Sequence, residues 1–342
     1  MHQMGAFFSR SINVSAKVIA LSSLTGAVIG AVRASPDTLW SDIWTGALTG
    51  FVISLCCLLA EYQVFSNPKR RMTRRLRPIL LMILRGAAYS LFIVFGLLVP
   101  DMLTETDQPW KGPAFAGLFA ISAAIAFAFS IGIEVTRLLG KEATVALFTG
   151  RYTKARLEQR VILFADVIGS TALAETIGQL RFHDFLRDVA LDLADAVEMT
   201  RGDVHKYVGD SVIVTWKLSN GLANATCLRC ALEMHRILAS RAEFYKKRYS
   251  AAARIRVAIH CGEVAAGEIG DWKKEIALLG DPMNTAARIE GAAKMFNADI
   301  VLSNDVVCQL PIEHHQRLTR LPSFKAPGKQ DELSLWSADF YS

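Results

Sequence analysis

The sequence predicts an α+β domain preceded by a membrane domain of four helices. Residues 1–135 contain four apolar stretches of about the 20 residues that a helix needs to cross a bilayer. Beyond residue 160 the hydrophobic spacing changes repeatedly between the periods of a strand and of a helix, which is typical of mixed α and β structure. We therefore divide the 342-residue chain into a transmembrane domain at 1–135, a helical connector at 136–159 and a second domain at 160–342.

The charge of the chain does not favour a nucleic-acid partner. The formal net charge of +6 comes from 38 Lys and Arg against 32 Asp and Glu, and six of the basic residues lie between Lys69 and Arg77. Residues 136–342 are almost neutral, so they lack the basic surface that a phosphate backbone requires. A hydrophobic fraction of 52% indicates a lipid bilayer instead.

The predicted spans lie at residues 12–32, 43–59, 79–99 and 115–135. The loop between the second and third spans carries the basic cluster at 69–77, whereas the next loop is mainly acidic. Because Lys and Arg beside short loops stay on the cytoplasmic side, we expect a multi-pass protein with both termini in the cytoplasm. Arg85 is the one full charge well inside a span. No acidic partner is apparent at its depth, so we expect its side chain to reach the interface.

Residues 136–159 are mixed and charged, with a short apolar helical face. They form either a passive tether or a dimerising element that carries a signal. In the second domain, the CxxC pair Cys227 and Cys230 has no further pair or nearby His to complete a zinc site, which favours buried helix cysteines.

The second domain begins with a buried strand at 160–167, followed by a long helix at 170–199 that Ser170 or Thr171 caps. A hairpin turns at Val208-Gly209-Asp210. The remaining periodicity predicts strands at 204–207, 211–216, 254–260, 263–270, 275–279 and 300–302, and helices at 220–247 and 284–296. The core order is then β-α-β-β-α-β, the ferredoxin-like arrangement.

Two aspartates lie where strands end or turn. Asp166 follows a buried apolar run, and Asp210 lies at the hairpin tip. Antiparallel neighbours would bring the two carboxylates together, an arrangement that hard cations stabilise in phosphoryl-transfer sites. A capping or turn role is the alternative for each residue alone.

Phosphate contacts are predicted at two helix starts. Gly169, Ser170 and Thr171 lead from the first strand into a helix, whose free N–H groups can bind phosphate oxygens. Asn284 and Arg288 lie four residues apart on one helix face, where an amide and a guanidinium suit a ribose and a phosphate. For this second pair the alternative is a solvated face on which Arg288 pairs with Asp281 or Glu290.

Three motifs occur together in a fixed order: Phe164-Ala-Asp-Val-Ile-Gly-Ser-Thr171, Lys206-Tyr-Val-Gly-Asp210 and Asn284-Thr-Ala-Ala-Arg288. Together they resemble the catalytic domain of class III adenylyl/guanylyl cyclases, over about residues 158–337. The resemblance implies a catalytic domain at 160–342 and a bacterial membrane-bound enzyme of the inner membrane, with catalysis in the cytoplasm.

The resemblance also implies roles for residues. Asp166, Asp210 and the backbone carbonyl of Val167 would hold two Mg²⁺ or Mn²⁺ ions. Asn284 and Arg288 would act on the ribose and on the reacting phosphate, and Lys325 would bind the terminal phosphates. Because the family completes each site with residues from two protomers, a homodimer with shared sites is implied.

Base selection is where the sequence departs from the family pattern. Lys206 matches the lysine that reads adenine, but the polar residue expected three positions before Gly280 is Ala277, which has no side-chain hydrogen-bonding group. ATP remains the predicted substrate and cyclic AMP the product. A guanylyl or promiscuous purine cyclase is one alternative, and a non-catalytic membrane receptor or scaffold is another.

Overall fold

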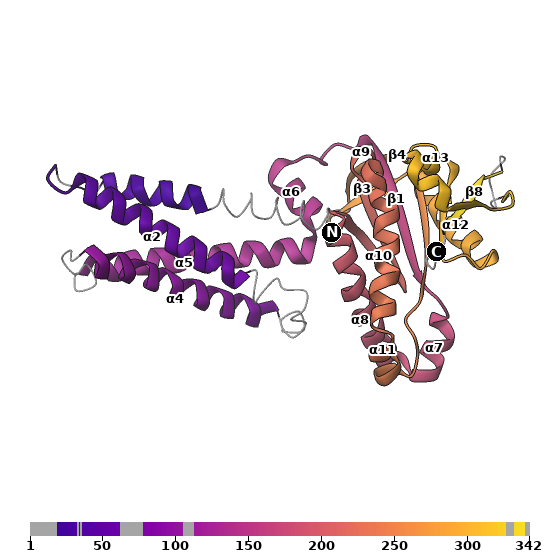
Figure 1. Cartoon of the computed structure of the whole chain (residues 1–342), viewed down its shortest axis with the longest axis horizontal. Helices are drawn as coiled ribbons and strands as arrows, with labels where there is room; N and C mark the ends of the chain where they lie inside the picture. Colours follow the sequence, from indigo (N-terminus) through magenta and orange to yellow (C-terminus); the bar gives the residue numbers. More distant parts are fainter. Residues whose placement is uncertain are drawn as a thin grey trace. The chain divides into compact units, whose positions relative to one another are not determined.

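The computed structural model describes residues 19–32, 34, 36–61, 78–104, 113–325 and 332–338. The chain forms two compact units that divide between Leu138 and Leu139. The first unit is made of helices, and the second is a mixed sheet covered by helices (Figure 1).

In the first unit, two helices are long and apolar enough to cross a membrane. They are α2 (Leu39–Ala60) and residues Ile79–Leu98 of α4 (Pro78–Thr104). α5 (Pro113–Leu139) reaches that standard only together with α6 (Lys141–Thr149), the short helix that follows it.

The four predicted spans are therefore not all shown. The described part of the first span is the helix Ile19–Val32, which is too short to count as a span by itself, and residues 1–18 lie outside the described ranges. Two spans, or three with the broken one, are supported within the described residues. The basic cluster at 69–77 also lies outside them, so the orientation of the helices stays a prediction.

Glycines bring the helix Ile19–Val32 into close contact with α2. A Cβ placed on Gly26 would lie 2.0 Å from the backbone oxygen of Gly46, and one on Gly46 would lie 2.2 Å from that of Gly26. No side chain fits at these distances, so the two backbones pack directly, as small residues allow between membrane helices.

Arg85 is buried between helices, and the expectation that it has no acidic partner is wrong. Its Nε lies 3.1 Å from Oε2 of Glu61, and its Nη1 lies 3.7 Å from Oε2 of Glu134. Tyr89 donates a hydrogen bond of 2.8 Å to Glu61. The acidic partners come from the end of α2 and from α5, and such a pairing between helices leaves no signature within one apolar stretch.

The second unit is built on an eight-stranded sheet with the order β2-β3-β1-β4-β6-β8-β7, in which β5 also pairs with β4. Among the strand pairs formed by the described residues, only β4–β6 is parallel. The strands are β1 (Arg156–Val167), β2 (Asp203–Val208), β3 (Ser211–Lys217), β4 (Ile255–Ile269), β5 (Glu275–Leu279), β6 (Ile300–Ser303), β7 (Leu318–Arg320) and β8 (Leu335–Ala338).

Helices cover both faces of this sheet. Alternate residues of β1 point to opposite faces, and Val161 and Leu163 pack with α8 (Gln179–Met199) and α10 (Thr226–Ser240), which run alongside each other in Figure 1. Ile162 packs on the other face with residues of α6 and of α12 (Asp281–Met295). The remaining helices are α7 (Ser170–Ile177), α9 (Leu218–Leu222), α11 (Ala242–Tyr249) and α13 (Asn304–Val307).

Several element boundaries differ from the prediction. The helix predicted at 170–199 is two helices that meet at Gly178, which has a φ of +80°. The helix predicted at 220–247 is broken near Asn224 and Ala225, both with a φ of +50°, and again between α10 and α11. β4 is a single strand instead of the two predicted at 254–260 and 263–270, because its residues 255–266 pair with β1 without a break.

Cys227 and Cys230 are fully buried on α10, which confirms that they are core residues of a helix. Burial raises the pKa of both thiols to about 12, so neither is a thiolate at neutral pH.

Candidate active site

Asp166 lies near the end of β1, where this strand leaves the core. The preceding residues 161–163 are fully buried, whereas Asp166 is half-buried. Its register partner on β3 is Ser211, whose hydroxyl donates a hydrogen bond of 2.6 Å to Oδ1 of Asp166. The carboxylate is therefore held in a fixed position near the end of β1.

Asp210 lies beside Asp166 because it precedes Ser211 in the β2–β3 turn. Gly209 makes this turn possible with a φ of +60°, a conformation that favours glycine. Burial and the charge of Asp210 raise the pKa of Asp166, against the opposing effects of the Ser211 hydrogen bond and of nearby cations. A carboxylate whose charge is disfavoured by a neighbouring carboxylate belongs to a site that a divalent cation would stabilise.

The donor set suits hard cations that share their coordination with a substrate. Among the described residues there is no cluster of three or more His, Cys, Asp or Glu side chains that could hold a metal by itself. Two carboxylates, with the backbone carbonyl of Val167 next to Asp166, match the few protein ligands that Mg²⁺ takes when phosphates supply the others. These residues therefore fit the metal ions that the resemblance implies.

Two cations beside this site were not predicted from the sequence. Arg256 on β4 is the register partner of Asp166, and Lys294 lies on α12. The charges of both oppose the net rise in the pKa of Asp166 that burial and Asp210 cause. Arg256 could be placed beside Asp166 only from the register in which the strands at 160–167 and 254–260 pair. Sequence alone does not fix that register.

The predicted phosphate-binding turn is present at the start of α7. Gly169 is the N-cap residue with a φ of +73°, and no side chain caps the helix, so the predicted capping by Ser170 or Thr171 is not formed. Ser170 and Thr171 occupy the first two helical positions. The N–H groups of this first turn have no partner within the helix and can donate hydrogen bonds to an anion.

Asn284 and Arg288 lie on α12, with Asn284 exposed and Arg288 half-exposed. Pro282 starts this helix after Gly280, whose φ is +143°. Arg288 does not pair with Asp281 or Glu290, and within the described part of the chain neither Asn284 nor Arg288 forms a side-chain hydrogen bond or ion pair. Their polar groups are thus available to a ligand.

Lys206 on β2 forms an ion pair with Glu275 on β5, with 2.9 Å between Nζ and Oε1. This partner was not predicted, because 69 residues separate the two. Ala277 is buried on the same strand. Lys325 is exposed beside the isolated bridge between Phe324 and Leu333, and the residues directly after it lie outside the described ranges.

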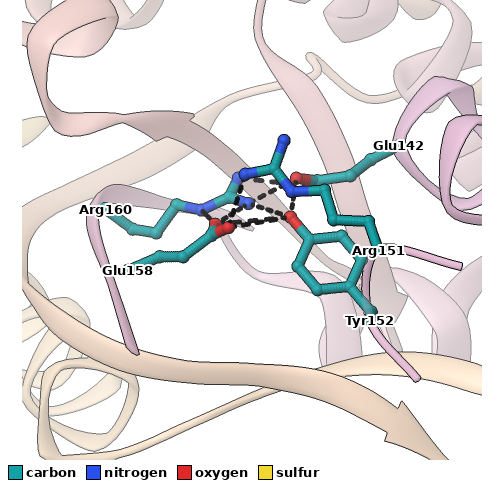
Figure 2. Close-up of polar contacts among 5 residues, drawn as sticks. All are labelled: Glu142, Arg151, Tyr152, Glu158 and Arg160. Carbon is teal, nitrogen blue, oxygen red and sulfur yellow. Dashed lines mark hydrogen bonds and ion pairs between the residues drawn. The ribbon is translucent and has the colours of Figure 1, made fainter. Parts of the chain in front are cut away.

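A polar cluster joins α6 to β1, and we call it the connector network: Glu142, Arg151, Tyr152, Glu158 and Arg160 (Figure 2). Arg160 is at its centre, with a side chain that is 3% exposed, and it binds the carboxylates of both Glu142 and Glu158. The hydroxyl of Tyr152 donates a hydrogen bond of 2.7 Å to Glu142 and accepts one of 2.9 Å from Arg160. This network was not predicted from the sequence, because its members are spread over two predicted elements.

Comparison with known proteins identifies the catalytic region. Residues 152–336 match the model of the family described as the adenylate and guanylate cyclase catalytic domain. Adenylate cyclase 2 of Rhizobium meliloti is 35% identical over 205 residues, which are 60% of this chain and 56% of that protein. An adenylate cyclase of Anabaena cylindrica is 26% identical over 53% of this chain and 37% of its own length. The chain thus matches about half or less of these relatives.

A solved bacterial light-regulated adenylyl cyclase has the same fold, with a TM-score of 0.55 and 15% identity over 70% of this chain and 67% of that one.

Proposed function

Because the chain belongs to the family of adenylate and guanylate cyclase catalytic domains, we propose that it is an adenylate cyclase that converts ATP into 3′,5′-cyclic AMP and pyrophosphate. The observation that carries this proposal is the neighbouring pair of carboxylates formed by Asp166, which Ser211 holds near the end of β1, and Asp210 in the β2–β3 turn. Two bacterial relatives are named adenylate cyclases, which supports ATP as the substrate.

Asp166, Asp210 and the Val167 carbonyl would hold two Mg²⁺ or Mn²⁺ ions. When bound, such ions lower the pKa of the attacking ribose 3′-hydroxyl and neutralise charge on the phosphates. Arg256 and Lys294 add positive charge beside the same carboxylates. These two cations would offset part of the repulsion between Asp166 and Asp210 before metal ions bind.

The other residues bind and orient the nucleotide. Asn284 would hold the ribose so that its 3′-hydroxyl lies in line with the α-phosphate, and Arg288 would stabilise the charge that grows on that phosphate. The N–H groups at Gly169, Ser170 and Thr171 would donate hydrogen bonds to phosphate oxygens. Lys325 would bind the terminal phosphates.

We further propose a homodimer in which each site takes Asp166 and Asp210 from one protomer and Lys206, Asn284 and Arg288 from its partner. The unpaired state of Asn284 and Arg288 within the described chain supports this arrangement. A C2 interface would produce two equivalent sites.

The apolar helices support anchoring in the bacterial inner membrane. In this proposal residues 1–135 form the multi-pass membrane domain, 136–159 the connector, and 160–342 the cytoplasmic catalytic domain.

The test is cyclase activity of the purified full-length protein with Mn²⁺ and ATP, in a preparation that is verified to be dimeric. We expect cyclic AMP from the wild type and none above background from Asp210→Ala. Glu243→Gln is the matched control, because this carboxylate is 90% exposed on α11, and it should retain full activity. A dimeric wild-type protein that forms no cyclic nucleotide would refute the proposal.

A guanylyl or promiscuous activity is the second candidate, favoured by the apolar Ala277 at a position where the family pattern has a polar residue. Competition of ATP with GTP in the same assay separates the two activities.

A further inference from the structure

The ion pair between Lys206 and Glu275 joins two strands that are far apart in the sheet order. β2 is at one edge of the sheet, and β5 pairs with β4. The side chains of Lys206 and Glu275 are 43% and 37% exposed, so a ligand can reach both. An inference from this pair rests on the proposed function, in which Lys206 reads the purine base.

Glu275 and Ala277 are two residues apart on β5, so their side chains lie on the same face of the strand. Ala277 is 6% exposed and has no hydrogen-bonding side chain. Glu275 therefore provides a polar group two residues before Ala277, on the strand face where Ala277 has none. Its contact with Lys206 places that group beside the base-reading lysine.

The pair presents a donating group, the Lys206 ammonium, beside an accepting group, the Glu275 carboxylate. A lysine ammonium can only donate, and an ionised carboxylate can only accept. The hydrogen bond and the charge of Lys206 hold the pKa of Glu275 below its ordinary value, so the carboxylate is ionised at neutral pH.

Adenine and guanine differ at the edge that such a pair would meet. Adenine has an acceptor at N1 and an amino donor at N6, whereas guanine has a donor at N1 and an acceptor at O6. With the ammonium at N1 and the carboxylate at position 6, adenine makes both hydrogen bonds. Guanine would place its N1–H against the ammonium and its O6 against the carboxylate, so neither hydrogen bond would form. A site rejects a wrong substrate when its polar groups are left unpaired in this way.

We propose that Glu275 is a specificity residue that accepts a hydrogen bond from the exocyclic amino group of adenine and replaces the polar side chain missing at Ala277. The Lys206–Glu275 contact does not have to break when the base binds. An ammonium has three donors and a carboxylate about four acceptor positions, so each group can serve its partner and the base together.

The experiment compares ATP with GTP for the full-length wild type, Glu275→Gln and Glu275→Ala. Two readouts are used: the ratio of kcat/KM values with Mn²⁺, and the ratio of affinities from competition against a fluorescent ribose-labelled ATP. We expect both ATP/GTP ratios to fall by about tenfold in Glu275→Gln, because an amide can either accept from N6 or donate to O6. Glu275→Ala/Ala277→Thr should regain part of the preference.

Glu268→Gln is the matched control, because Glu268 pairs with Lys274 at 3.5 Å next to the same β4–β5 turn but has no link to Lys206. Its ratios should equal those of the wild type. Unchanged ratios in both Glu275 variants, or an equal change in Glu268→Gln, would overturn the role of Glu275. If the wild type forms no cyclic product, the proposed function fails, while the binding ratios still decide whether Glu275 selects the base.

Discussion

Replacing Arg160 should detach α6 from the catalytic unit. Its buried guanidinium is the shared partner of Glu142 on α6 and Glu158 on β1. Arg160→Met keeps the length of the side chain but leaves two carboxylates facing each other. Removing one partner of a buried ion pair costs about 3–5 kcal/mol. Because the side chains of Glu142 and Glu158 are 22% and 12% exposed, we expect the lower end of this range.

Amide hydrogen exchange measures this effect directly, because it reports the free energy of local opening. A loss of about 3 kcal/mol corresponds to roughly 100-fold faster exchange. The informative amides belong to Thr144 and Gly150, which donate hydrogen bonds of 3.1 and 2.8 Å to carbonyls of the α6 segment. Amides of α10 should keep their protection, which shows that the remainder of the unit is folded.

Arg151→Met is the matched control within the connector network. The side chain of Arg151 is 33% exposed, and within the described residues its one carboxylate partner is Glu158, at 2.7 Å. An ion pair of this kind is worth at most about 1 kcal/mol, or roughly a fivefold change in exchange. Adding Glu142→Gln to Arg160→Met should restore part of the protection by removing an uncompensated charge. Equal exchange of α6 in Arg160→Met and Arg151→Met would refute the central role of Arg160.

Three further predictions concern pH, the metal site and the membrane unit. Burial raises the pKa of Glu142 and Glu158, but Arg160, together with Tyr152 at Glu142 and Arg151 at Glu158, lowers both pKa values overall, so the stabilisation that these carboxylates provide is complete above their ordinary pKa of 4.5 and is lost as the pH falls through the lowered values. The amides of α6, corrected for intrinsic exchange rates, should lose protection in that acidic window and not above it. Ser211→Ala should raise the half-saturating Mn²⁺ concentration by about 10-fold, whereas Ser211→Thr keeps the hydroxyl and should stay near wild type; equal values for the two would contradict the positioning role. Gly46→Leu should lower the unfolding midpoint in detergent through overpacking that costs about 1–3 kcal/mol, but Gly132→Leu should not, because a Cβ there has no atom within 4 Å.

Features that depend on local sequence could be predicted. The run that ends at Asp166, the turn that holds Asp210 and the helix that carries Asn284 each depend on neighbouring residues, and the structure has all three in the predicted elements. Their roles in binding and catalysis stay predictions that the experiments above test.

Features that depend on pairing between distant segments could not be predicted. Arg256 lies opposite Asp166 only because β1 and β4 pair in one particular register. Glu275 meets Lys206 through the folding of the whole sheet, and Glu61 and Glu134 meet Arg85 through the packing of separate helices. A hydrophobic pattern indicates which face of an element is buried, but it does not indicate which charged groups meet there.

The connector network decides where the chain can be cut. A soluble fragment that begins after α6 would retain Arg160 in the interior of β1 and would lose Glu142, one of its two carboxylate partners. It would also lose Ala146, which is 2% exposed and belongs to the same buried cluster as Ile162 of β1 and Ala286 of α12. A fragment that begins at Leu139, where the second unit starts, keeps all these contacts. The boundary of the folding unit is therefore upstream of the first cyclase-family residue, so a fragment designed from the family match alone would be too short.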